Sequence, residues 1–104
     1  MFDSLEVMLS VLELLGPIEA KVRRHNASLA KQMTRAAESV ALNLGEGRCR
    51  EDGDRRRHYE MAAGSASELT AALRIAHLRR YVDMAAIDAQ LDRVRAMLYK
   101  LTRA

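Results

Sequence analysis

Apolar residues recur at steps of three and four along most of the chain, which is the period of an amphipathic α-helix. Four such stretches, separated by short polar or glycine-marked segments, cover residues 4–24, 26–47, 54–80 and 84–102. Alanine, leucine, arginine and glutamate dominate them, and all four are strong helix formers. Four rods of this length joined by short turns predict one all-α domain over residues 1–104, folded as an up-down-up-down antiparallel four-helix bundle.

Local signals place the ends of these helices. Pro17 removes a backbone hydrogen bond and clashes with the preceding turn, so Gly16-Pro17 predicts a kink or break. Asn26 is expected to cap the second helix, and Gly47 to end it in a left-handed conformation. A turn is expected over residues 48–54. Acidic residues are expected to cap the remaining helices: Asp52 or Asp54 the third and Asp83 the fourth.

The first and third helices carry more apolar surface than a monomeric bundle requires. One core-facing stripe per helix suffices for a monomer, whereas the first helix has two stripes and the third has a second, mixed face. This surplus predicts a homo-oligomer. The residues expected between subunits are Val7, Val11, Leu14, Met61 and Ile75.

Composition excludes several classes of function. The formal net charge is +3, and arginine, whose planar fork suits phosphate, greatly outnumbers lysine. The single cysteine, Cys49, permits no intrachain disulfide, and the three histidines lack metal-site spacing. No apolar run approaches the ~18–20 residues that span a bilayer. We therefore expect a cytoplasmic protein with no cofactor, no metal and no membrane partner.

Polar and glycine residues interrupt the second and third helices, where they cost stability and need a specific reason. We predict a partly buried polar clasp between these helices, with the mid-helix glycine allowing close approach. Its members are Asn43, Glu46, Gly47, Gly64, Ser65 and Glu68. Two alternatives stay open: an exposed recognition patch, and an acid–base or metal site built on Glu46 and Glu68. The second lacks the Glu-x-x-His pairs of di-iron bundles.

Basic residues gather in two groups. The first surrounds the start of the third helix, where cations oppose the helix dipole, so they are candidates for phosphate binding: Arg48, Arg50, Arg55, Arg56 and Arg57. Three acidic residues lie among them, so a solvated turn is the alternative. The second group belongs to the first turn and should lie at the opposite end of the bundle: Lys21, Arg23, Arg24, His25 and Lys31.

The chain has no Walker A loop, dinucleotide fingerprint, zinc-finger spacing or Ser-His-Asp set. We therefore expect a non-enzymatic protein. Three hypotheses follow: an oligomeric adaptor that binds RNA or DNA, a protein-binding scaffold with solvated arginines, and, more weakly, an enzyme using Glu46 and Glu68.

Two motifs resemble those of a known bacterial family. They are Asn43-Leu44-Gly45-Glu46-Gly47 followed by Arg50, and Ala63-Gly64-Ser65 followed by Glu68-Leu69. The family comprises small four-helix-bundle proteins of intervening sequences in large-subunit ribosomal RNA genes, and the resemblance spans residues 29–82. It implies a homopentamer. The chain is also similar to accessory proteins of diversity-generating retroelements, which implies nucleic acid and a reverse transcriptase as partners.

Overall fold

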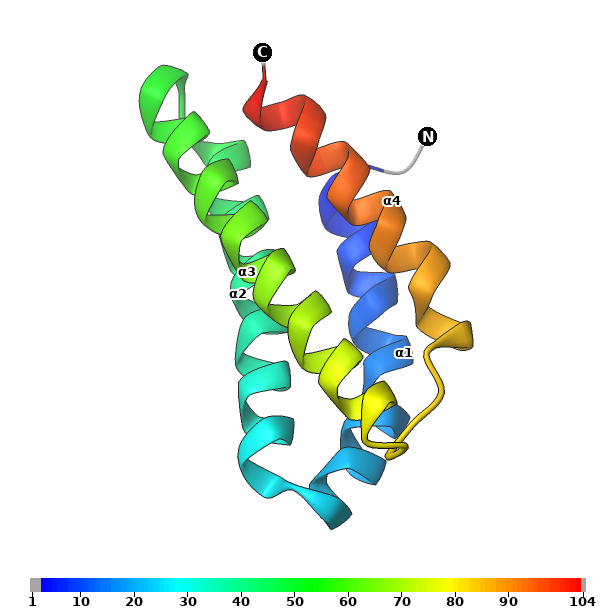
Figure 1. The fold of residues 1–104 in the computed structure, drawn as a ribbon. Coiled ribbons are helices and arrows are strands. Elements are labelled where there is room, and N and C mark those ends of the chain that lie inside the picture. Colours follow the sequence, from blue (N-terminus) through cyan, green and yellow to red (C-terminus); the bar gives the residue numbers. More distant parts are fainter. Residues whose placement is uncertain (1–2, 104) are drawn as a thin grey trace.

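The computed structural model describes residues 3–103, and within them the chain forms four helices and no strand. These are α1 (Ser4–His25), α2 (Ala27–Cys49), α3 (Asp52–Leu78) and α4 (Ala85–Thr102). Successive helices run in opposite directions, so the α1–α2 and α3–α4 connections share one end of the bundle (Figure 1). The α2–α3 turn lies at the other end, beside the start of α1 and the end of α4. The predicted all-α bundle is confirmed.

The core is a single apolar cluster to which every helix contributes. Each helix packs against two neighbours: α1 against α2 and α4, and α3 against α2 and α4. Met8, Met33, Leu73 and Leu91, one from each helix, are fully buried at its centre. A helix with two neighbours buries a broad stripe rather than a narrow seam.

This geometry corrects part of the predicted subunit interface. Val7 is 3% exposed and Val11 is fully buried, both inside the core of the same chain. Leu14 is partly buried and packs against that core. The two apolar stripes of α1 therefore face α2 and α4, and only Met61 and Ile75 of the predicted set remain exposed.

The predicted helix caps are confirmed in part. The Asn26 side chain accepts a hydrogen bond from the Leu29 amide at 2.9 Å, as an N-cap residue should. Asp83 accepts from the Ala85 amide at 3.0 Å, although Met84 occupies the cap position of α4. The cap predicted for α3 is wrong, because Glu51 precedes that helix without a side-chain cap. α1 continues unbroken through Pro17, so no break occurs there.

The α2–α3 turn is shorter than predicted, because only Arg50 and Glu51 lie outside the two helices. Gly47 lies inside α2, and none of the glycines in residues 3–103 has a positive φ, so the predicted left-handed ending is wrong. The Arg55 side chain instead binds carbonyls at the end of α2. None of the four helices is both long and apolar enough to cross a membrane within the part of the chain described.

Candidate functional site

A chain of polar contacts joins α2 to α3 on the outer side of the core. The two hydroxyls of Ser39 and Ser65 lie 2.8 Å apart across the helix pair. The Asn43 amide donates to the Ser39 carbonyl at 2.9 Å, and its oxygen lies 3.1 Å from Nδ1 of His58. All four residues are partly buried. Asn43 and Ser65 thus share one clasp, and Ser39 and His58 complete it.

The direction of these contacts indicates one tautomer of His58. An Arg57 guanidinium nitrogen lies 3.3 Å from Nε2 of His58, and guanidinium only donates. In the neutral imidazole, Nε2 therefore accepts, and the proton on Nδ1 is donated to the Asn43 oxygen. The Asn43 orientation fits, since its NH₂ group is then free to donate to the Ser39 carbonyl.

The other predicted clasp members lie elsewhere. Glu46 and Glu68 are exposed, and Glu46 pairs with Arg50 at 3.2 Å on the same helix. Gly64 is also exposed, and a Cβ added there would meet nothing within 4 Å, so close helix packing does not explain this glycine. Gly47 is buried against the ring of Tyr59, where a Cβ would collide. The clasp is therefore smaller than predicted and contains no carboxylate.

The candidate enzyme site is not assembled in this geometry. The carboxylates of Glu46 and Glu68 are solvent-exposed rather than enclosed in a cavity. Across residues 3–103 no group of three or more histidine, cysteine, aspartate or glutamate side chains is placed to hold a metal ion.

The five arginines predicted to bind phosphate do gather at the α2–α3 end of the bundle, but four of them face carboxylates. The ion pairs are Arg48–Asp3 (3.1 Å), Arg50–Glu46 (3.2 Å), Arg56–Glu60 (3.6 Å) and Arg57–Asp54 (3.0 Å). The hydrogen bond from Arg57 is the main cause that lowers the pKa of Asp54, and the charges of Arg57, Arg50 and His58 add to it against the opposing effect of burial. This end is therefore a mixed-charge surface. The phosphate-binding role of its arginines stays a prediction.

Two of these arginines have a structural task as well. Arg55 Nε donates to the carbonyls of Gly47 at 3.0 Å and Arg50 at 2.8 Å, which satisfies acceptors left open at the end of α2. Arg56 donates to the Thr102 carbonyl at the end of α4, 3.1 Å away. Both side chains thus bind helix carboxyl ends.

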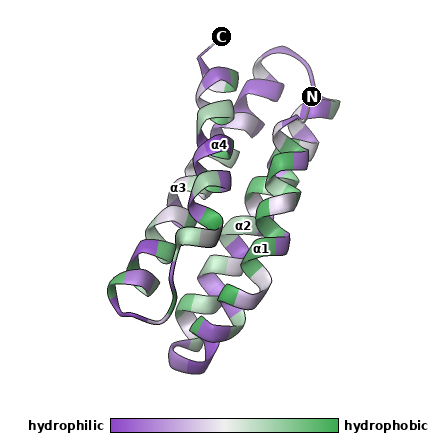
Figure 2. Cartoon of the chain, turned by 90° about the vertical axis from the view of Figure 1, so that its right-hand side faces the viewer, coloured by the Kyte–Doolittle hydropathy of each residue, from purple (hydrophilic) through white to green (hydrophobic). Residues whose placement is uncertain are grey.

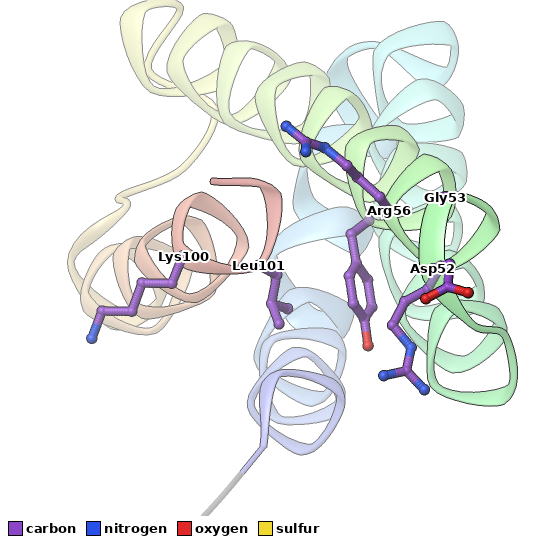
Figure 3. A pocket seen from close by; sticks show the side chains of 7 residues that line it. Asp52, Gly53, Arg56, Lys100 and Leu101 are labelled. Atoms are coloured by element: carbon purple, nitrogen blue, oxygen red, sulfur yellow. The ribbon is translucent and has the colours of Figure 1, made fainter. Parts of the chain in front are cut away.

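A groove of about 600 Å³ separates the start of α3 from the end of α4 (Figure 3). Its lining includes Asp52, Gly53, Arg56 and Lys100. Figure 3 shows Lys100 extending from α4 away from Asp52 and Gly53. Arg56 is engaged with the end of α4, Lys100 points away, and the Asp52 carboxylate lies in the lining, so the groove does not gather its cations into one anion site.

The opposite end of the bundle has a different electrostatic character. Residues 18–34 and 70–88 meet there, and they hold seven lysines and arginines against three carboxylates. Their formal net charge is +4, which exceeds the +3 of the whole chain. We call this surface the basic end. The α1–α2 connection there is hydrophilic (Figure 2), whereas the α3–α4 connection also carries Val82 and Met84, which pack against the core. The exposed cations of the basic end are Lys21, Arg23, Arg24, Lys31, Arg74, Arg79 and Arg80.

The carboxylates of the basic end leave most of these cations free. Glu19 pairs with Arg23 on α1, and the Asp83 side chain accepts from the Ala85 amide. Within residues 3–103, Arg23 is the only cation of the basic end that has a carboxylate within ion-pair distance. Free positive charge on this protein is therefore concentrated away from the arginine group predicted to bind phosphate.

The sequence predicted only the part of the basic end that belongs to the α1–α2 connection. The group from Lys21 to Lys31 was placed opposite the α2–α3 turn, and this position is confirmed. Arg79 and Arg80 were missed, although they follow α3 and the antiparallel topology brings them to the same end. The signal was available: successive turns of an up-down bundle alternate between its two ends.

The fold and its charged surfaces define a small, all-α four-helix bundle whose polar residues form an interhelical clasp and a basic end. The family model described as 23S rRNA-intervening sequence protein matches residues 4–100, and the chain belongs to this family. No curated protein and no solved structure shows significant similarity to the chain.

Proposed function

We propose that this protein is a non-enzymatic, oligomeric bundle that binds RNA or DNA through its basic end. The observation that carries the proposal is the separation of charge along the bundle. A net +4 lies at one end, with six of its seven cations unpaired by carboxylates in the part of the chain described, while the rest of the molecule is slightly acidic. Clustered lysine and arginine on one face are the electrostatic footprint of phosphate-backbone binding.

Helix dipoles give a competing explanation for part of this charge. Arg23, Arg24 and His25 occupy the last turn of α1, where cations are favourable without any ligand. The same effect applies to Arg79 and Arg80, which directly follow the last residue of α3. Lys31, however, lies near the start of α2, where the helix dipole does not favour a cation. Binding measurements therefore decide between the two explanations.

Assembly would strengthen a modest basic end. A ring of copies repeats the same surface, so several weak contacts act on one nucleic-acid strand. Exposed apolar side chains on α2 and α3 support self-association, and they are Leu42, Met61, Ile75 and Leu78. A homopentamer and a reverse transcriptase partner, which the resemblance implies, belong to this proposal.

The direct test compares two charge-matched variants in a salt titration with labelled RNA and DNA. The basic-end variant carries Arg24→Ala, Lys31→Ala and Arg79→Ala. The control variant removes three arginines from the other end: Arg48→Ala, Arg50→Ala and Arg57→Ala. The parent should bind both nucleic acids with strong salt dependence, since each phosphate contact on a single strand contributes about 0.7 to the slope of log K against log salt. The basic-end variant should lose affinity and slope, and the control should keep both.

Each other outcome contradicts a stated part of the proposal. Loss of binding in the control variant alone would return the phosphate site to the α2–α3 end. An unshifted parent at micromolar concentration near physiological salt would contradict nucleic-acid binding altogether. The second candidate function, a protein-binding scaffold, would then be favoured by the exposed apolar side chains of α2 and α3.

A further inference from the structure

The basic end contains a pair of stacked rings that the charge argument does not use. His25, the last residue of α1, stacks on Tyr81 with ring centroids 4.8 Å apart and an angle of 2° between the ring planes. Tyr81 lies in the α3–α4 connection and packs against the core, whereas His25 is exposed. Tyr81 therefore covers one face of the imidazole, while His25 as a residue remains exposed.

Cations flank this stack in the sequence on both sides. Arg24 directly precedes His25, and Arg79 and Arg80 directly precede Tyr81. All three are exposed and lack a carboxylate partner among residues 3–103. An exposed stacked ring with unpaired arginines next to it in the sequence suits single-stranded nucleic acids, because they offer an unpaired base and a phosphate together.

The backbone at Arg80 gives an independent reason to seek a function here. Arg80 has φ 63°, in the left-handed region, and the Tyr81 amide bonds back to the Ala76 carbonyl at 2.9 Å. This is the position after a helix where glycine is usual, because a Cβ is unfavourable there. An arginine at this position costs backbone energy that glycine would not, so a role for its side chain is worth testing.

We propose that the His25–Tyr81 stack and Arg80 form a clamp for single-stranded nucleic acid. One unpaired base stacks on the free face of His25, and the adjoining phosphates bind Arg80, Arg79 and Arg24. The clamp rests on the proposed function. It adds that the ligand is single-stranded and that its bases bind by stacking, without regard to sequence. In a duplex the bases are already stacked on one another, so duplexes can use only the cations of this site.

The test uses the full chain and four probes: a short single-stranded RNA of mixed sequence, a blunt duplex of equal length, an abasic strand with the same phosphates, and polyglutamate. The parent should prefer the single strand over the other three. His25→Ala should weaken single-strand binding on the order of ten-fold and leave the abasic strand unchanged, since base–aromatic stacking supplies that much. His25→Phe keeps a flat ring and should retain the binding of the parent.

Arg80→Gly separates function from folding. Glycine relieves the left-handed backbone, so this variant should melt at the same temperature as the parent or higher. It should nevertheless bind both the single strand and the abasic strand more weakly, because a phosphate contact is lost. A structural role for Arg80 predicts no change in binding.

The possible failures are distinguishable. If the parent binds no nucleic acid, the proposed function and the clamp both fail. If it binds single strand and duplex equally, and His25→Ala and Arg80→Gly leave both unchanged, the clamp is wrong and the proposed function stands. Equal affinity for polyglutamate and RNA would assign the basic end to acidic protein partners and overturn the clamp.

Discussion

Gly47 lies directly against the ring of Tyr59 where α2 and α3 pack at the end of the bundle. A Cβ added to Gly47 would lie 2.8 Å from Cδ1 of Tyr59 and nearer still to Cε1, distances at which one of the groups must move. Both residues are buried, so the ring would have to leave its packed position, toward the groove that it lines. The glycine is needed for close approach to an aromatic ring and not for a left-handed turn.

We expect Gly47→Ala to destabilise the protein by about 1–3 kcal/mol, the usual range for an overpacked core site. Gly45→Ala, two residues away on the same helix, meets nothing within 4 Å. It should stabilise the protein by about 0.5–1 kcal/mol, because glycine in a helix interior loses more conformational freedom than alanine. Thermal unfolding of the two variants measures the contrast.

The collision itself can be tested with a double mutant. Tyr59→Leu removes the ring, so it should reduce the cost of Gly47→Ala, and the two changes should not add. Equal or higher stability of Gly47→Ala in the parent background would contradict the contact.

Arg55 should matter for stability, because it is the residue that ends α2. Arg55→Ala removes the donor to two helix carbonyls, and we expect a loss of about 1–3 kcal/mol. Arg57→Ala removes an exposed ion pair and should change stability by no more than about 0.5 kcal/mol. Urea unfolding of both variants makes the comparison. Equal effects would show that Arg55 does not cap α2, which would restore it as a phosphate contact.

The lowered pKa of Asp54 predicts how the stability of the fold changes with pH. Arg57 donates to Asp54 at 3.0 Å, and this lowers its pKa below the ordinary value of 3.8. A carboxyl whose pKa is lower in the folded state stabilises the fold above its unfolded pKa, and this contribution disappears as the pH falls through the lowered value. The difference in melting temperature between the parent and Asp54→Asn should therefore shrink between about pH 5 and about pH 2.

Arg57 provides the matched control for this titration. Arg57→Ala removes the principal cause of the lowered pKa, so Asp54→Asn in that background should show a much flatter dependence on pH. A difference between parent and Asp54→Asn that stays constant over the whole range would contradict the role of the pair.

The helices and their order follow from periodicity, because the apolar spacing of each stretch reflects burial that the bundle then provides. The helix ends were less predictable for a physical reason. α2 stops where the side chain of Arg55, eight residues beyond Gly47, reaches its carbonyls, and no local pattern records such a contact. The reason for a glycine within a helix is equally hard to predict from sequence. Gly47 lies against the ring of Tyr59, whereas a Cβ on Gly64 would meet nothing within 4 Å.

The candidate sites show the same limit. Polar residues facing each other on α2 and α3 made a clasp predictable. His58 was not predicted as a member, because its contact is with Asn43, fifteen residues away in the sequence. The charge of the arginine-rich turn was visible, and so were the nearby carboxylates that pair with three of its arginines, whereas the pairing of Arg48 with Asp3 at the start of α1 required the fold. The basic end combines two turns far apart in the sequence, so its net charge emerges only when the topology is known.

The last prediction concerns self-association through the outer face of α3. Met61, Gly64, Ile75 and Leu78 repeat at helical spacing along it, and Leu42 lies exposed on α2, the helix that packs beside it. Leu42 is 69% and Leu78 80% exposed, so both side chains are fully accessible to a second copy. If the chain self-associates as proposed, the paired change Met61→Glu and Ile75→Glu should give single chains that remain folded, because both positions are about half exposed.

Substitutions of the buried valines of α1 are the control for this experiment, because they test folding rather than assembly. Val7→Ser with Val11→Ser should unfold the chain rather than dissociate it, because both side chains belong to its own core. Gly64→Ala should leave the fold intact while disturbing assembly if the glycine lies where two copies approach closely, since its Cβ meets nothing within one chain. Sedimentation at micromolar concentration, combined with circular dichroism, separates the three variants. A parent that sediments as one chain of 11.7 kDa would contradict self-association, and the exposed row on α3 would then belong to a different partner.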